Sequence, residues 1–151
     1  SKGVMAMQND KKINEIAILL EKYKNVPFMH NGRTLAGLDC LGFVIHFYKN
    51  FGIYLPDNDG RKIEEDWYKT DPFRLIRNIG KLNGIQVSKE DLQPLDMVYF
   101  AISNDIISHL GVMINYKEFA HMSPKSNFII SKMERHWKVR CRGAIRFVSF
   151  N

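Results

Sequence analysis

The spacing of apolar residues predicts helices in the first half of the chain. Between residues 9 and 23, apolar side chains recur every three or four positions, which is the pattern of a helix with one buried face. Asn9 or Asp10 has the short polar side chain that often caps the start of a helix. A second apolar stretch with helical spacing begins near Cys40 and ends before Gly52, a residue type common at helix C-termini.

The pattern changes to that of strands in the second half. Short runs rich in β-branched and aromatic residues predict strands at residues 97–102, 109–114, 118–121, 127–130 and 144–150. Helical patterns are found at residues 61–69 and 72–82, separated at Asp71-Pro72, and in the turn 134–137. Helices followed by antiparallel strands predict an α+β fold, and the lack of linkers or repeats predicts one domain over residues 1–151.

The composition is that of a globular domain and does not favour a membrane-spanning or nucleic-acid-binding protein. Hydrophobic residues make up 45% and charged residues 25% of the chain, and no apolar run approaches the roughly 20 residues that span a bilayer. The formal net charge is +6, but the basic residues are dispersed, which favours a solvated surface over a nucleic-acid interface. No signal peptide is visible, although a chain that begins at Ser1 says little about a natural precursor.

Cys40 lies where a loop meets the second predicted helix. Backbone N–H groups at a helix N-terminus are unpaired and the helix dipole is positive there, so we expect the thiolate of Cys40 to be favoured. Such a cysteine is a candidate nucleophile if a base lies near it. Cys141 lies in no motif and is interpreted as an inert free thiol, because a disulfide scaffold would carry more cysteines.

Histidine is the most common partner base for such a thiol, and the candidates are His30, His46, His109, His121 and His136. His46 lies six residues after Cys40 on the opposite side of the helix, and we expect that it does not reach the thiol. His109 begins one predicted strand and His121 ends the next, so an antiparallel hairpin can bring their rings together. For His30, in the loop before the cysteine, a surface position is favoured over a position in a cleft.

Several segments, in order, resemble the NlpC-type cell-wall peptidases, a papain-like family of cysteine hydrolases. The resemblance rests on Asp39-Cys40-Leu41-Gly42-Phe43-Val44, the tail 48–56, Pro94-Leu95-Asp96-Met97-Val98 and the histidine-bearing segments 108–114 and 119–123. Their order and spacing match over about residues 20–148. Pro27-Phe28, Gly32-Arg33 and the segment 137–147 are most similar to the bacteriophage tail-associated branch. The fold implied is papain-like, with N-terminal helices, the nucleophile at a helix N-terminus, and a curled antiparallel sheet or small barrel packed on that helix.

The resemblance implies a catalytic triad. Cys40 takes the place of the nucleophile, and His109 takes the place of the general base that later acts as an acid. His121 takes the place of the third residue, which orients the base. The backbone N–H of Cys40 would then help to form the oxyanion hole.

The resemblance also implies contacts to the substrate. Phe28 stands where the family has a tyrosine near the substrate, and Leu41 stands where serine often follows the nucleophile. Asp39 and Ser108 are expected to be polar contacts to the substrate. Leu95 stands at a position that the family gives to a turn glycine.

The implied function is hydrolysis of an amide bond in the stem peptides of peptidoglycan, with no metal or organic cofactor. The bond commonly cut joins the γ-carboxyl of D-glutamate to a diamino acid. The expected partner is a stem peptide or muropeptide, with phage tail proteins added for the phage branch. The chain would act in the cytoplasm, be delivered by a phage particle, or be a trimmed secreted form. Three alternatives stay open: a structural or assembly component of a phage-like tail, an amidase or acyltransferase acting on another substrate, and a zinc site built from Cys40 and two histidines.

Overall fold

The computed structural model describes residues 2–57, 67, 82–103 and 105–147. Its helices are α1 (Lys2–Leu20), the single 3₁₀ turn η1 (Glu21–Tyr23), α2 (Cys40–Lys49) and α5 (Arg135–Arg140). A two-stranded ribbon, β1 (Arg33–Thr34) and β2 (Gly37–Leu38), precedes α2. The remaining strands are β3 (Ile85–Val87), β4 (Met97–Ser103), β5 (Ile106–Met113), β6 (Glu118–Ser123), β7 (Asn127–Lys132) and β8 (Cys141–Arg146).

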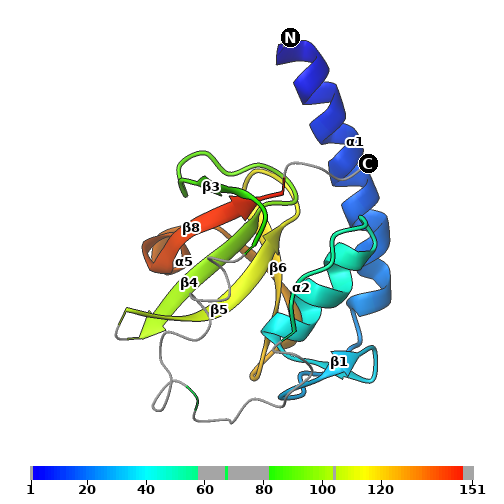
Figure 1. Cartoon of the computed structure of the whole chain (residues 1–151), viewed down its shortest axis with the longest axis vertical. Helices are drawn as coiled ribbons and strands as arrows, with labels where there is room; N and C mark the ends of the chain where they lie inside the picture. The colour runs from blue at the N-terminus through cyan, green and yellow to red at the C-terminus, as the bar shows by residue number, and fades with distance from the viewer. Residues whose placement is uncertain (1, 58–66, 68–81, 104, 148–151) are drawn as a thin grey trace.

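These six strands form one antiparallel sheet in the order β3-β8-β4-β5-β6-β7. Helix α2 packs against β5 and β6 on one face, and α5 lies beside β4 and β8 on the other (Figure 1). The sheet is open, with β3 and β7 at its edges, so it does not close into a barrel. The predicted α+β arrangement, with Cys40 at the start of a helix that packs on an antiparallel sheet, is confirmed.

Apolar side chains alternate along the strands and build a core on each face of the sheet. Met97 and Tyr99 of β4 face the larger core under α2, whereas Val98 and Phe100 face the smaller core under α5. The larger core includes an aromatic cluster in which Tyr23 lies edge-on to Phe43, with ring centroids 5.2 Å apart. Because each fully buried aromatic or aliphatic side chain contributes about 1.5–3 kcal/mol, the larger core fixes α2 on the sheet and the smaller core fixes α5.

The first helix begins earlier than predicted. Neither Asn9 nor Asp10 caps it, because the helix extends back to Lys2 through residues with high helix propensity such as Met5, Ala6 and Gln8. Asn9 instead lies inside the helix, is buried, and donates a hydrogen bond from its side-chain amide to the Tyr116 hydroxyl at 2.8 Å.

The other predicted helices and strands differ from the observed ones mainly at their ends. The start of α2 at Cys40 is confirmed, β5 begins three residues before His109, and β8 begins at Cys141 rather than Ala144. The predicted turn 134–137 is extended into α5, whereas the short strands β1 to β3 were not predicted. Apart from Trp67 and Leu82, the helical segments predicted at 61–69 and 72–82 lie outside the described residues.

Leu95 has a backbone conformation that favours glycine. Its φ is 77°, in the left-handed region, where a Cβ costs roughly 1–2 kcal/mol. The resemblance had placed Leu95 at the position of a turn glycine, and the backbone agrees with that assignment. The leucine side chain is 97% buried in the larger core (3% exposed), and this burial offsets the strain.

Two glycines near α2 provide a test of this packing. Gly42 lies in the first turn of α2, and a Cβ there would overlap the carbonyl oxygen of Gly32. Gly52 follows α2 with φ +73° and has open space around its Cα. We expect Gly42→Ala to lower the free energy of unfolding by about 1–3 kcal/mol or more through overpacking, and Gly52→Ala by about 1 kcal/mol through strain. Urea unfolding measures both, and a Gly42→Ala protein as stable as wild type would contradict the close approach.

Candidate active site

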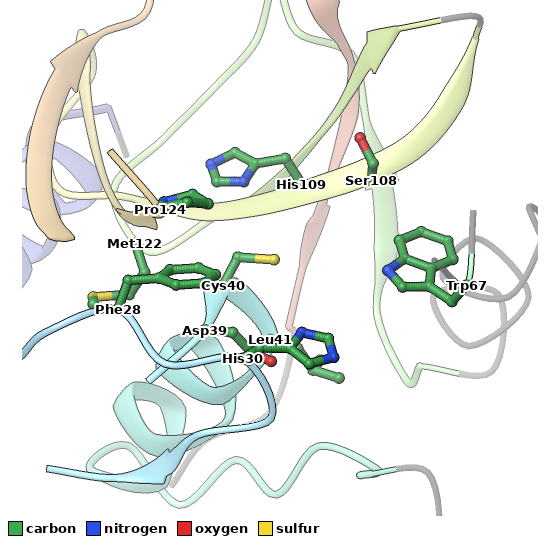
Figure 2. Close-up of a pocket in the computed structure, with 10 residues that line it drawn as sticks. All are labelled: Phe28, His30, Asp39, Cys40, Leu41, Trp67, Ser108, His109, Met122 and Pro124. Atoms are coloured by element: carbon green, nitrogen blue, oxygen red, sulfur yellow. The ribbon is translucent and has the colours of Figure 1, made fainter. Parts of the chain in front are cut away.

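A cavity of about 160 Å³ lies between the start of α2, the loop before β1, and strand β5 (Figure 2). It is lined by Phe28, His30, Asp39, Cys40, Leu41, Trp67, Ser108, His109, Met122 and Pro124. Six of the seven site residues predicted from the sequence therefore line one cavity. The seventh, His121, lies directly behind His109 and is 2% exposed.

The position of Cys40 is set by the residue before it. Asp39 is the N-cap of α2, and its Oδ1 accepts a hydrogen bond from the Gly42 N–H at 2.7 Å. The same carboxylate accepts from the Asn31 N–H at 2.8 Å and forms an ion pair with Arg33 at 2.9 Å. Asp39 lines the cavity, as predicted for a substrate contact, but its oxygens already hold the loop, the ribbon and the helix together.

The local environment favours the neutral thiol of Cys40. Burial raises the pKa of Cys40 to about 12, and the negative charge of Asp39 acts in the same direction. The backbone N–H groups of Leu110 and Leu41 and the charge of Arg33 oppose this shift without reversing it. The expectation of a favoured thiolate is therefore wrong, because desolvation and Asp39 outweigh the helix terminus. The interaction with the Leu110 backbone also places the sulfur beside β5, next to His109.

A β-bulge brings two neighbouring residues of β5 to the cavity. Phe100 of β4 pairs with His109 and Ala101 pairs with Ile107, so Ser108 is an extra residue between the two pairs. In a regular strand Ser108 and His109 would point to opposite faces, whereas the bulge lets both line the cavity. Figure 2 shows Ser108 and His109 next to each other along this strand.

Behind the cavity, a chain of hydrogen bonds runs across three strands. The Nε2 atom of His109 lies 2.8 Å from Nδ1 of His121, and Nε2 of His121 lies 2.8 Å from the hydroxyl of Ser131 on β7. Burial lowers the pKa of His109 to about 4. Burial, together with the neighbouring His109, lowers the pKa of His121 to about 3. Both imidazoles are therefore neutral at pH 7, the state in which His109 can accept a proton.

Aromatic rings cover this pair of histidines on the α5 side. The ring centroid of Trp137 lies 5.7 Å from that of His109 and 5.0 Å from that of His121. Phe119 lies 4.5 Å from His121, and Phe100 lies 5.8 Å from His109. These rings keep the dyad in an apolar setting, which is the physical cause of the lowered pKa values.

Of the remaining three histidines, one lines the cavity. His46 bonds through Nδ1 to the Tyr23 hydroxyl at 2.7 Å and is not among the cavity residues, as predicted. His136 lies on α5 and stacks near Trp137, with ring centroids 5.3 Å apart. His30 lines the cavity, so the favoured surface position was wrong. Among the described residues, no three His, Cys, Asp or Glu side chains are grouped as metal ligands would be.

Sequence patterns had not pointed to Ser131. A single serine on a strand carries no signal by itself, and its partner His121 lies ten residues away on the neighbouring strand. The register that pairs Phe119 with Ser131 places the serine diagonally across from the histidine. Only a correct β6–β7 register would have identified it.

Comparison with known proteins identifies the family of this chain. Residues 25–146 match the model of the NlpC/P60 family. The chain belongs to the NlpC/P60 family. Its members among solved structures share the fold: an NlpC/P60 protein from Bacillus cereus has a TM-score of 0.65 at 23% identity, covering 93% of this chain and 40% of the other.

Two relatives of this chain carry enzyme names. Escherichia coli murein DD-endopeptidase MepS/murein LD-carboxypeptidase is 33% identical over 129 residues, which cover 84% of this chain and 58% of MepS. The γ-D-glutamyl-L-lysine dipeptidyl-peptidase of Bacillus cereus is 26% identical over 106 residues, covering 69% of this chain and 26% of the relative. The chain thus spans little more than half of MepS. No helix in the described residues is both long and apolar enough to cross a membrane.

The lowered pKa values of the histidine pair predict how stability depends on pH. An imidazole in the unfolded chain titrates near about 6.5, above the folded pKa of about 4 for His109. Between these values the unfolded state binds the proton and the folded state does not, so stability falls as the pH drops from about 6.5 toward 4. We expect His109→Gln to lose less unfolding free energy than wild type between pH 7 and 5, measured by urea unfolding. Parallel pH curves for the two proteins would contradict a buried neutral His109.

Proposed function

We propose that this NlpC/P60 domain is a cysteine peptidase that hydrolyses amide bonds in peptidoglycan stem peptides. The observation that carries the proposal is that Cys40 and His109 line one cavity while the far nitrogen of His109 is bonded to His121. A nucleophile, a base and a group that orients the base are the parts that acyl transfer needs. The relatives named as peptidoglycan enzymes support the class of substrate.

The hydrogen bonds assign the proton transfer to one atom of His109. Because Nε2 is engaged with His121, Nδ1 is the nitrogen left to take the proton of the Cys40 thiol. The raised pKa of Cys40 and the lowered pKa of His109 keep both groups neutral before substrate binds. Proton transfer is therefore coupled to attack of the sulfur on the scissile carbonyl, and His109 acts as a general base.

The start of α2 is our candidate for stabilising the negative charge that forms on the carbonyl oxygen when the thiol attacks. The N–H groups of Gly42 and Phe43 already bond to the side chain and the carbonyl of Asp39. The N–H of Cys40 lies one turn earlier, at the positive end of the helix dipole, and it is our candidate donor to the oxyanion. Collapse of the tetrahedral intermediate gives a thioester on Cys40, and protonated His109 donates its proton to the leaving amine. Water activated by the same histidine then releases the acid.

The charges at the cavity favour an endopeptidase over an enzyme that requires a free substrate amine. Asp39 is paired with Arg33 at 2.9 Å, so its negative charge is compensated before any ammonium group arrives. Phe28 offers a ring but no hydroxyl to such an amine. We therefore propose cleavage between γ-D-glutamate and the diamino acid within stem peptides whose N-terminal amine is blocked.

Three further parts of the sequence interpretation stay proposals. The segments similar to the bacteriophage tail-associated branch point to delivery with tail proteins as partners, or to a structural component of such a tail. The apolar lining by Phe28, Leu41, Met122 and Pro124 is also compatible with acyl transfer on another amide or ester. A single catalytic domain over residues 1–151 is likewise our working boundary.

Replacing the nucleophile tests the proposal most simply. We expect Cys40→Ala to lower muropeptide cleavage by at least about 10³-fold, because it removes the thiol that forms the acyl intermediate. Cys141→Ala is the matched control, since Cys141 is 1% exposed and its thiol contacts the Gly143 carbonyl away from the cavity. Mass spectrometry of products from defined muropeptides measures both. Turnover by folded Cys40→Ala would exclude the assignment.

The charge argument predicts a substrate preference. Wild type should cleave an N-acetylated L-Ala-γ-D-Glu-diamino acid peptide at least as fast as the same peptide with a free amine. Arg33→Met uncovers the charge of Asp39 and should shift the ratio of kcat/KM values toward the free amine by about three- to tenfold. The ratio is independent of the fraction of folded enzyme. An unchanged ratio in the variant would show that the Arg33–Asp39 pair does not set this preference.

A further inference from the structure

Ser131 ends the hydrogen-bond chain that begins at the cavity. Its hydroxyl lies 2.8 Å from Nε2 of His121, whose other nitrogen lies 2.8 Å from His109. His121 is 2% exposed and is packed between the rings of Phe119 and Trp137. A polar nitrogen in that setting needs a partner, since a buried unpaired N–H costs about 1–3 kcal/mol.

In the resting enzyme this chain can run in either direction. Neutral His109 can donate from Nε2 to His121, or His121 can donate from Nδ1 to His109, and the 2.8 Å distance fits both. A serine hydroxyl can accept from Nε2 of His121 in the first case and donate to it in the second. Only the first direction leaves Nδ1 of His109 free to take the thiol proton.

In the charged state the direction is fixed. Once His109 has taken the proton of Cys40, both of its nitrogens carry hydrogen, so Nε2 must donate to Nδ1 of His121. Neutral His121 then carries its hydrogen on Nε2, and the acceptor at 2.8 Å is the oxygen of Ser131. The serine therefore bonds in the one direction that catalysis requires when positive charge develops on His109.

We propose that Ser131 is a positioning residue that stabilises the imidazolium form of His109 by accepting the proton of His121 Nε2. The proposal rests on the proposed function, because it assigns a role to Ser131 in the same proton transfer. Removing the acceptor leaves a buried N–H when His109 is charged. The protonated form of His109 is thereby disfavoured, because it fixes that unpaired N–H on His121.

A matched pair of substitutions separates the hydroxyl from its packing. Ser131→Thr keeps the hydroxyl, whereas Ser131→Val has the shape of threonine without it. Both β-branched residues suit a strand. We expect Ser131→Val to lower kcat by about tenfold with little change in KM, and Ser131→Thr to stay within about threefold of wild type. Ser126→Ala, an exposed serine in the β6–β7 turn, is a control for loss of a surface hydroxyl.

A second measurement reads the same effect without any substrate. Side-chain ¹⁵N NMR distinguishes the tautomers of His109 and His121 and follows their protonation with pH. We expect Ser131→Val to protonate His109 at lower pH than Ser131→Thr does. Equal pH dependence of His109 protonation and equal kcat in the two variants would overturn the role of Ser131. If the NMR difference is present but no peptide is cleaved by wild type, the proposed function fails while the hydrogen-bond role stands.

Discussion

The carboxylate of Asp39 is the constraint on which the site depends. One side chain caps α2 through the Gly42 N–H, fixes the loop through the Asn31 N–H and neutralises Arg33 of β1. Because Cys40 is the next residue, these contacts decide where its sulfur lies relative to β5. The close approach of Gly42 to the Gly32 carbonyl belongs to the same assembly. The carboxylate of Asp39 therefore holds the parts of the site in place, whether or not it also contacts a ligand.

The opposite wall of the cavity depends on the sheet. The bulge at Ser108 lets Ser108 and His109 line the same cavity as Cys40, and the pairing of β5, β6 and β7 aligns His109, His121 and Ser131 across three strands. The rings of Phe119 and Trp137 pack against the buried His121. In the proposed mechanism Cys40 and His109 stay neutral until the thiol attacks, and the hydrogen bonds take one direction once His109 is charged.

The sequence was sufficient for features that depend on local patterns. It identified Cys40 at a helix start because an acid and a glycine-bearing loop precede an apolar helix, and it identified His109 and His121 because each lies on a predicted strand. The sequence did not predict features that depend on pairing across the sheet. These are the bulge at Ser108 and the contact of Ser131 with His121. The protonation of Cys40 was mispredicted because the helix dipole is visible in a sequence and desolvation is not.

The central claim is that the sulfur of Cys40 becomes covalently acylated with help from His109. Acid quenching within milliseconds of mixing with a defined muropeptide, followed by digestion and mass spectrometry, tests this claim most directly. The account predicts a thioester carrying the γ-D-glutamyl fragment on the peptide that contains Cys40, and its loss in His109→Gln. Release of product with no adduct on Cys40, or with an adduct on another residue, would contradict the account.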